Sequence, residues 1–301
     1  MYAKILVPLD GSKTAENVVP LARNFARGLQ IPVELLGVVD VAERARHGPP
    51  SQASMIRSIV DDVTRRFDDY LERVAKNFFV GKVQCTVRMG NAAEAIIELA
   101  AAEKQTLIVM ATHGRSGLDR WLLGSVAEKV LRGASNPTLV VRAKKEKNPA
   151  WEMATLKRVL VPVDGSELSE RVLPHVEALA KHLDLEVTLL GVYGGRLSAG
   201  ADDGFHSRDA FIVTLRNETA IYLAAKTEEM KQRGLNKVSF AAKQGLEADE
   251  IIATARETLD TLIAMCTHGR TGVQRWMLGS VTETVVRHSD DPVLVVRSTD
   301  P

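Results

Sequence analysis

The chain has 301 residues, of which 45% are hydrophobic, 26% charged and 5% aromatic. This composition excludes disorder for most of the length and suits one large or two ordinary domains. The 39 Lys and Arg residues nearly balance the 38 Asp and Glu residues, and the formal net charge of +1 gives no general reason to bind nucleic acid or an anionic membrane.

The first half alternates between short hydrophobic runs typical of strands and longer runs typical of helices. The runs at 33–39 and 107–111 are too continuously apolar for a sheet with one exposed face. The alternation predicts an α/β fold in which right-handed crossovers cover both faces of a parallel sheet. In chain order, we expect strands at 5–9, 33–39, 83–89, 107–111 and 138–141, and helices at 14–29, 54–78, 92–103 and 125–132.

The sequence then repeats itself. Residues 4–12, KILVPLDGS, return as 158–166, RVLVPVDGS, and residues 110–115, MATHGR, return as 265–270, MCTHGR. Because the offset hardly changes over about 100 residues, each copy is a whole domain. We expect domain 1 over 1–145, a linker over 146–155 and domain 2 over 156–301, with strands of the second copy at 159–163, 186–192, 238–242, 261–266 and 293–296.

The two halves carry opposite net charges. Residues 1–150 hold 22 Lys and Arg against 16 Asp and Glu, which gives +6, and residues 151–301 hold 17 against 22, which gives −5. This difference either favours docking of the two halves on each other or reflects neutral drift of solvated surfaces.

Nothing in the sequence predicts a membrane helix, a signal peptide or a metal site. No apolar run approaches the roughly 18 to 20 residues that a membrane helix needs. Residues 1–8 lead directly into a strand and lack the order of a signal peptide, so we expect a cytoplasmic protein. Cys85 and Cys266 fall one in each half without CxxC spacing, which predicts neither a disulfide nor a zinc site.

The first motif of chemical interest follows the first strand of each copy. In the run PLDGS, Asp10 leaves the sheet just before a Gly turn, and Ser12 is placed to cap the next helix. Ligands of parallel sheets bind at the carboxyl ends of strands where the crossover direction reverses. Asp10 is therefore either a turn residue alone or an acceptor for ribose hydroxyls or a base edge.

The second motif follows the strand at 107–111 and combines glycines with the start of a helix. Glycines let backbone N–H groups approach an anion, and the helix that begins at Ser125 offers unpaired N–H donors and the positive end of its dipole. The spacing fits neither the Walker motif nor GxGxxG. The recurrence of the same pattern before Ser280 strengthens the prediction of a phosphate site.

At these residues the chain resembles the universal stress protein family, here with two domains in tandem. The VPxDGS strand end and the late G-x2-G-x9-G-[ST] loop, followed by Val, each occur twice and span nearly the whole chain. The resemblance implies two doubly wound five-stranded parallel-sheet domains, Rossmann-like and similar to adenine nucleotide alpha hydrolases. In the nucleotide-binding branch it also implies ATP, with or without Mg²⁺.

By this resemblance, adenine and ribose lie near the Asp of the first strand, and the phosphates lie in the glycine loop. Val38 and Val192 would meet adenine through their backbone groups. The matched candidates of the first copy are Pro8, Asp10, Val38, Met110, Ala111, Gly114, Arg115, Gly124, Ser125 and Val126, and those of the second are Pro162, Asp164, Val192, Met265, Cys266, Gly269, Arg270, Gly279, Ser280 and Val281.

The sequence departs from the family pattern at the first glycine of the loop, which is Ala111 in one copy and Cys266 in the other. A thiol is bulkier than a methyl group, and a positive φ at this position would strain both residues. We therefore expect weaker ATP binding in the second copy. A redox role for Cys266 is the alternative to an inert buried thiol, which we favour.

Other polar and aromatic residues near the motifs have local interpretations. His113 and His268 are expected to pack their loops rather than act as general bases, since no reacting partner is evident. Arg115 and Arg270 either bind phosphate or face solvent. We interpret Trp121 and Trp276 as packing anchors. In the loops that follow the second strands, Arg44 and Arg46 contrast with Asp202 and Asp203, and these loops either assist phosphate binding or are uninvolved.

Three functions are consistent with these motifs. The leading one is an ATP-binding stress-response or signalling module, in which nucleotide occupancy selects one arrangement of the protein. A slow ATPase or self-phosphorylating enzyme is weaker, because no Walker lysine, acidic metal pair or dedicated base is evident. A nucleotide-free interaction protein is opposed by the retained glycines. The family habit of paired domains predicts that the strand edges at 138–141 and 293–296 pair within the chain, and a homodimer is compatible but not required.

Overall fold

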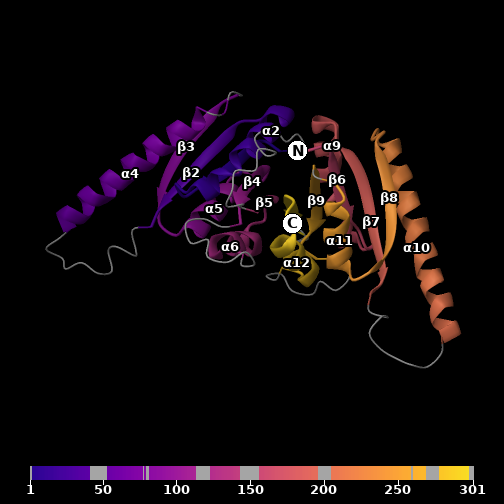
Figure 1. The fold of residues 1–301 in the computed structure, drawn as a ribbon. Coiled ribbons are helices and arrows are strands. Elements are labelled where there is room, and N and C mark those ends of the chain that lie inside the picture. Colours follow the sequence, from indigo (N-terminus) through magenta and orange to yellow (C-terminus); the bar gives the residue numbers. More distant parts are fainter. Residues whose placement is uncertain are drawn as a thin grey trace. The chain divides into compact units, whose positions relative to one another are not determined.

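The computed structural model describes residues 2–40, 53–76, 78, 81–112, 123–142, 156–195, 205–258, 260–268 and 278–297 (Figure 1). The chain divides into two compact units, Met1–Ala154 and Thr155–Pro301. We describe each unit by itself. The expected linker at 146–155 lies outside the described residues.

Unit 1 contains a parallel five-stranded sheet. Its strands follow the order β3-β2-β1-β4-β5, so the crossover direction reverses between β1 and β4. Strands β2 and β4 are buried along nearly their whole length, as their continuous apolar runs predict. The strands are β1 (Lys4–Leu9), β2 (Val33–Val39), β3 (Val83–Met89), β4 (Thr106–Ala111) and β5 (Thr138–Val141).

The helices of unit 1 flank the sheet on both sides, which confirms the doubly wound α/β fold (Figure 1). They are α1 (Lys13–Glu16), α2 (Val19–Leu29), α4 (Ala53–Ala75), α5 (Ala92–Ala101) and α6 (Ser125–Gly133). The single helix predicted at 14–29 is wrong, because two helices occupy this span. Pro20 lies in the first turn of α2 and has no N–H to bond back to α1, so the chain ends one helix and starts another.

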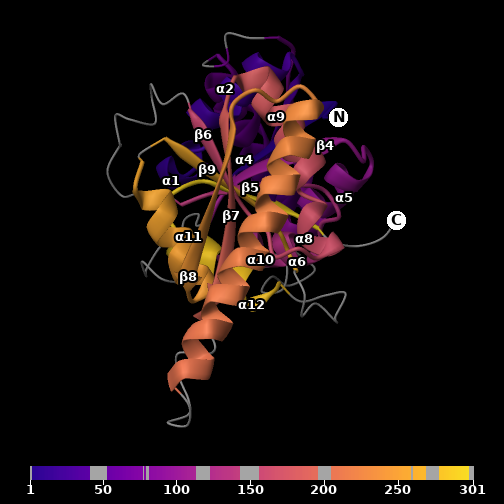
Figure 2. The ribbon, with the colours of Figure 1, turned by 90° about the vertical axis from the view of Figure 1, so that its right-hand side faces the viewer.

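Unit 2 repeats this architecture with the strand order β8-β7-β6-β9-β10. Pro174 lies in the first turn of α9, as Pro20 does in α2. The long helix α10 lies along β7 and β8 (Figure 2). The elements are β6 (Arg158–Pro162), α8 (Glu167–Glu170), α9 (Leu173–Leu183), β7 (Glu186–Gly194), α10 (Phe205–Gln232), β8 (Val238–Gly245), α11 (Glu247–Arg256), β9 (Thr261–Cys266), α12 (Ser280–His288) and β10 (Val293–Val296).

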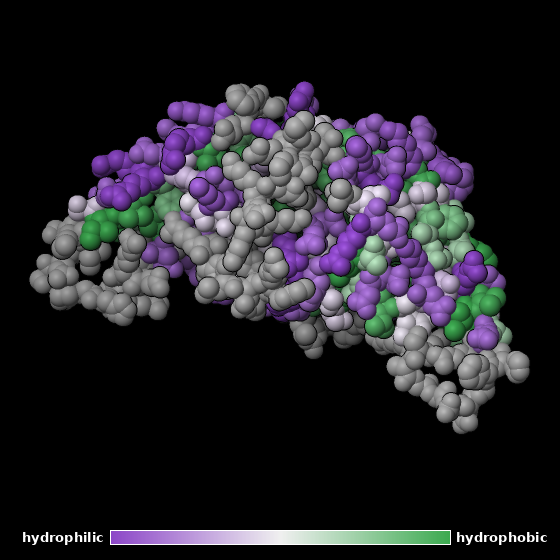
Figure 3. All heavy atoms as spheres, viewed as in Figure 1, coloured by the Kyte–Doolittle hydropathy of each residue, from purple (hydrophilic) through white to green (hydrophobic). Residues whose placement is uncertain are grey.

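The surface of unit 2 carries large apolar side chains on α10 and at β8. Ile221 of α10 is 71% exposed, and Phe211 and Val213 of the same helix are also exposed. Phe240 of β8 and Leu246, the residue after this strand, are exposed as well. Figure 3 shows apolar patches over this part of the molecule. Within the described residues, no helix is both long enough and apolar enough to span a membrane.

A glycine in the second strand of each unit lets the long helix approach the sheet. A Cβ on Gly37 would lie 2.7 Å from Phe67 Cδ1 of α4, and a Cβ on Gly191 would collide with Thr219 Cγ2 of α10 and lie 3.0 Å from Leu223 Cδ1. Close packing of helix on strand at these points therefore depends on the missing side chain.

We expect Gly191→Ala to lower the free energy of unfolding by about 1–3 kcal/mol, because overpacking forces α10 away from β7. The double variant Gly191→Ala/Thr219→Ser removes the methyl group that the new Cβ meets and should recover most of the loss. Urea denaturation of both variants measures this, and a double variant no more stable than the single one would contradict the steric explanation.

Candidate functional site

The candidate site lies where the central strand of each sheet ends. In unit 1, β1 pairs with β2 as far as Leu9 and Gly37, which places Asp10 beside Val38 of the neighbouring strand. The pairing of β1 with β4, on the other side, extends from Lys4 to Leu6. The ends of β1 and β4 therefore do not pair at the point where the crossover direction reverses, which is where parallel sheets bind ligands.

A proline explains why this ladder stops. In unit 2, Arg158 N donates to the Asp260 carbonyl beside β9, whereas Val163 N donates to Leu190 of β7. Because successive residues of a strand point their N–H groups to opposite sides, Pro162 faces β9, where it has no N–H to donate. In unit 1, Ile5 N donates to the Pro32 carbonyl beside β2, so the position of Pro8, three residues later, faces β4. Each central strand thus lacks the donor that would continue the ladder.

The carboxylate that follows β1 is held in a tight turn. Asp10 Oδ1 accepts hydrogen bonds from Ser12 N at 2.9 Å and from Ser12 Oγ at 2.6 Å, and Ser12 Oγ accepts one from Ala15 N in α1 at 3.1 Å. Gly11 between them has a φ of 82°, a conformation that favours glycine. Asp10 is half-buried. Asp10 is therefore a turn residue, as one of the two interpretations predicts, and the turn places its carboxylate at the end of β1.

Unit 2 builds the same turn with one addition. Asp164 Oδ1 accepts from Ser166 N at 3.0 Å and Ser166 Oγ at 2.6 Å, and Gly165 has a φ of 81°. Ser169 adds a hydrogen bond that unit 1 cannot make, from Asp164 N to its hydroxyl oxygen at 3.3 Å, because Ala15 occupies the matching position. Asp164 is exposed, in contrast to the half-buried Asp10.

The helix after each loop begins beside the end of the fourth strand. Gly124 N donates to the Thr112 carbonyl, just beyond β4, at 2.8 Å, and Gly279 N donates to the Thr267 carbonyl beyond β9 at 2.9 Å. Both glycines are N-cap residues without a side chain, so they cannot cap the first-turn N–H groups. The first residues, Ser125 and Ser280, are exposed, whereas Val126 and Val281 are half-buried.

The fold itself requires glycine at position 279. A Cβ there would lie 2.5 Å from the Thr267 carbonyl oxygen. That carbonyl and the Cys266 carbonyl also accept hydrogen bonds from Thr282 Oγ1, at 3.4 and 2.9 Å. The motif glycine therefore allows the start of α12 to approach the end of β9, whatever ligand the site holds.

The residues at the first glycine position of the loop are not strained. Among the described residues, Gln30 and Asp184 are the non-glycine residues with positive φ, so Ala111 and Cys266 keep ordinary strand conformations. Cys266 is 5% exposed, whereas Ala111 is half-buried. The preceding Met110 and Met265 are each 5% exposed and pack into the strands. Cys266 thus has the buried environment expected of an inert thiol.

Several residues predicted from the sequence lie outside the described part of the chain. They include the loop glycines and arginines of both motifs, so their geometry remains a prediction. His268 is described, and its Nδ1 lies 3.1 Å from Thr267 Oγ1, which is a local contact. The residues outside are Gly114, Arg115, Gly269 and Arg270, together with His113, Trp121, Trp276, Arg44, Arg46, Asp202 and Asp203.

The sequence reading missed a tyrosine from the long helix that reaches each turn. Tyr222 of α10 donates to Glu170 Oε1 of α8 at 2.9 Å, and burial followed by this hydrogen bond raises the pKa of its phenol. Tyr70 is at the corresponding place in α4, where burial and then the Glu16 carboxylate raise its pKa. Tyr70 and Tyr222 are 152 positions apart, which is close to the offset of 154–155 between the repeated motifs, and this spacing is a sequence signal for the contact.

Over the described ranges, no group of three or more His, Cys, Asp or Glu side chains is placed to hold a metal ion. The site instead combines a carboxylate turn, a strand end without an N–H donor and a helix N-terminus. An α/β protein with these groups can accept hydrogen bonds from hydroxyl groups and donate hydrogen bonds to an anion.

Comparisons with known proteins give the family. The sequence model of the Universal stress protein family matches residues 1–142 and 155–297, so the chain belongs to this family and carries two copies of its domain. Universal stress protein MJ0531 of Methanocaldococcus jannaschii is 34% identical over 148 residues, which cover 48% of this chain and 85% of that protein. A universal stress protein of Mycolicibacterium smegmatis is 25% identical over 300 residues and covers 97% of this chain and 96% of its own length.

A solved structure supports the tandem fold. The crystal structure of a universal stress protein from Archaeoglobus fulgidus matches 98% of both chains with a TM-score of 0.67 and 21% sequence identity. At this identity the likeness shows the fold alone.

We expect Gly279→Ala to lower the free energy of unfolding by about 1–3 kcal/mol, because the added methyl group meets a backbone oxygen that cannot move freely. Ser280→Ala is the matched control, since it adds no atom near Thr267 and should change stability by less than about 0.5 kcal/mol. Thermal and urea unfolding of the two variants provide the comparison. Equal stabilities would show that α12 shifts without cost.

Proposed function

We propose that each unit binds an adenine nucleotide, ATP in particular, and that the chain acts as a nucleotide-dependent stress-response or signalling module. The observation that carries this proposal is the twofold occurrence of one arrangement: a strand-end carboxylate beside a ladder that a proline interrupts, with the N-terminus of a helix at the end of the next strand. Such an arrangement offers acceptors to a sugar and donors to phosphates.

The chemistry of the described residues fits these roles. Asp10 and Asp164 are anionic acceptors for ribose hydroxyls, which form strong charge-assisted hydrogen bonds. The N-cap residues of α6 and α12 are glycines, so no N-cap side chain accepts hydrogen bonds from the first-turn N–H groups. The helix dipole favours negative charge at these ends. Val38 and Val192, at the ends of β2 and β7, would contact adenine through the backbone. The loop residues Gly114, Arg115, Gly269 and Arg270 would complete the phosphate contacts.

Mg²⁺, where it accompanies ATP, would be held by phosphate oxygens and water, as is usual for this ion. A solved universal stress protein that matches 48% of this chain was crystallised in complex with cAMP. ATP is the nucleotide that the resemblance of the motifs to the nucleotide-binding branch of the family implies.

We further propose that the two units pair within one chain through β5 and β10. Each of these strands ends the strand order of its own unit, and an exposed edge strand invites association. Small-angle scattering should then give one compact particle, and scattering from two independently moving lobes would contradict pairing. The mass from sedimentation distinguishes a single tandem chain from a homodimer.

Asp10→Ala should weaken ATP binding to unit 1 about ten- to hundredfold, because removal of a charged acceptor costs about 1.5–3 kcal/mol. Isothermal titration calorimetry in a chain whose unit 2 is disabled by Asp164→Ala measures this. Ser12→Ala is the control, since it breaks the bonds of the Ser12 hydroxyl to Asp10 and Ala15 but keeps the carboxylate. An equal loss in both variants would show that Asp10 acts only through the turn.

We also expect unit 1 to bind ATP more tightly than unit 2. Asp10 is half-buried and Asp164 exposed, and the first half of the chain carries +6 against −5 in the second. Surface charge is screened beyond about 8 to 10 Å, so contact-distance differences such as Ala111 against Cys266 should dominate. Titrations of full-length Asp10→Ala and Asp164→Ala each report the other site, and Cys266→Gly should strengthen binding more than Ala111→Gly. Equal or reversed affinities would refute this ranking.

A further inference from the structure

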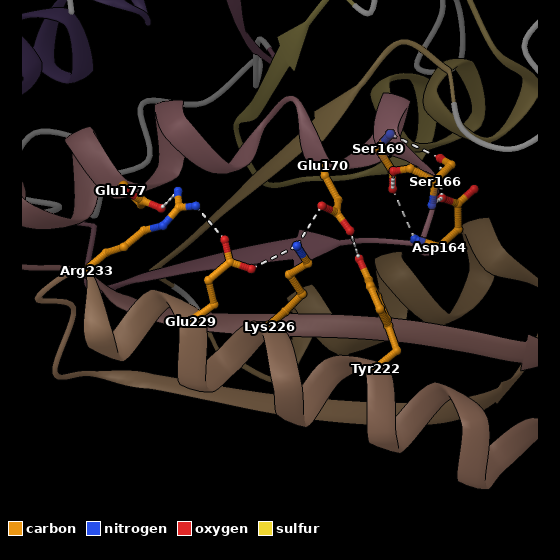
Figure 4. A network of polar contacts seen from close by, with 9 residues as sticks. All are labelled: Asp164, Ser166, Ser169, Glu170, Glu177, Tyr222, Lys226, Glu229 and Arg233. Atoms are coloured by element: carbon orange, nitrogen blue, oxygen red, sulfur yellow. Dashed lines mark hydrogen bonds and ion pairs between the residues drawn. The ribbon is translucent and has the colours of Figure 1, made fainter.

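A polar network joins α10 to the turn that carries Asp164 (Figure 4). Both carboxylate oxygens of Glu170 are held by α10: Oε1 accepts from the Tyr222 hydroxyl at 2.9 Å, and Oε2 lies 2.8 Å from Lys226 Nζ. The side chains of Lys226 and Glu170 are only 22% and 25% exposed, so water and salt screen this pair less than a surface ion pair.

Glu170 and Asp164 belong to one small rigid segment. Helix α8 has four residues, and its N-cap Ser166 both donates to Asp164 Oδ1 and accepts from Ser169 N at 3.2 Å. Ser169 Oγ in turn donates to the Ser166 carbonyl at 2.9 Å. A helix of one turn is not stable by itself. Contacts that hold Glu170 therefore also hold the carboxylate of Asp164 in place.

The protonation states that the network needs are the stable ones at neutral pH. The hydrogen bond to Glu170 raises the pKa of Lys226, so its ammonium stays charged. Burial and the same carboxylate raise the pKa of the Tyr222 phenol, so it stays a donor. The Lys226 hydrogen bond lowers the pKa of Glu229, which lies 2.9 Å from Lys226 and continues the network to Arg233.

The far end of the network fixes α10 a second time. Arg233, just beyond α10, contacts Glu229 and lies 3.1 Å from Glu177 of α9. The helix is thus tied to α8 near the Asp164 turn and to α9 farther away, as Figure 4 shows.

Unit 1 has the corresponding helix without the lysine of this tether. Tyr70 of α4 occupies the position of Tyr222, and burial followed by the nearby Glu16 carboxylate raises the pKa of its phenol. One turn later, Lys226 is replaced by Val74, which is 5% exposed and packs in the core. At this position the long helix therefore contributes an ammonium group in unit 2 and an apolar side chain in unit 1.

We propose that Tyr222 and Lys226 are positioning residues for the nucleotide site of unit 2, which fix the Asp164 turn through Glu170. This inference rests on the proposed function of that site. Asp164 is exposed and lacks the shelter of Asp10, and the ionic tether supplies the order that burial supplies in unit 1. Position and affinity of the second site thus depend on the Tyr222 hydroxyl and the Lys226 ammonium group of α10, whereas α4 has Val74 in place of the lysine.

The first test measures ATP affinity of unit 2 by calorimetry in full-length protein whose unit 1 is disabled by Asp10→Ala. Tyr222→Phe removes only the hydroxyl and should weaken binding about three- to tenfold. Lys226→Met should weaken it to a similar extent, and Lys226→Arg, which keeps the cation and its donors, should retain most of the affinity. The control is Thr214→Ala in the same background, which should leave binding unchanged, because the exposed Thr214 hydroxyl donates to the Ala210 carbonyl within α10.

The second test needs no nucleotide. Amide hydrogen exchange at Ser166 and Ser169 should become faster in Tyr222→Phe, while the amides of β6 and β9 keep their protection. Unchanged exchange at the turn together with unchanged affinity would overturn the inference, and so would a uniform increase over all of unit 2, which would mark Tyr222 as a general stability residue.

The two tests also separate this inference from the proposed function. If Asp164→Ala abolishes binding to unit 2 but Tyr222→Phe has no effect on affinity, the site is real and the positioning role is wrong. If the wild-type chain binds no ATP, the proposed function fails. Amide hydrogen exchange at Ser166 and Ser169 alone then decides whether α10 orders the turn.

Discussion

The hydrogen bonds of one carboxylate determine the geometry at the end of the central strand in each unit. Asp10 and Asp164 each accept two hydrogen bonds from the serine two residues later, and that serine caps a one-turn helix. The glycine between them has the positive φ that the turn needs. This closed turn directs the chain from strand into helix and leaves the carboxylate at the carboxyl end of the sheet.

Missing hydrogen-bond donors and missing cap side chains shape the rest of the site. Pro8 and Pro162 have no N–H on the side of β4 and β9, so the pairing there ends before the strands do. The helices α6 and α12 start from glycines that bond to the ends of β4 and β9 but have no side chain to cap the first turn. Polar groups left over from secondary structure are thus concentrated at the strand ends, where a nucleotide can use them.

Periodicity and motif spacing predicted the sheet well: the bounds of β2, β3 and β5 agree with the expected ones, and β2 and β5 are apolar runs. Residues 14–29 have the pattern of one helix, and only the structure shows that Pro20 lies in the first turn of a second helix. The contact of Tyr222 with Glu170 joins residues 52 positions apart, on the helix α10 that Gly191 allows to approach β7 closely. Local pattern cannot show such a contact, since it depends on how a helix docks.

The most direct test of the account is the number of nucleotides that remain bound to the protein. Native mass spectrometry of the full-length chain with ATP should show two bound nucleotides, one in Asp10→Ala, one in Asp164→Ala and none in the double variant. Two nucleotides retained by the double variant would place the binding elsewhere and contradict the central role of the strand-end carboxylates.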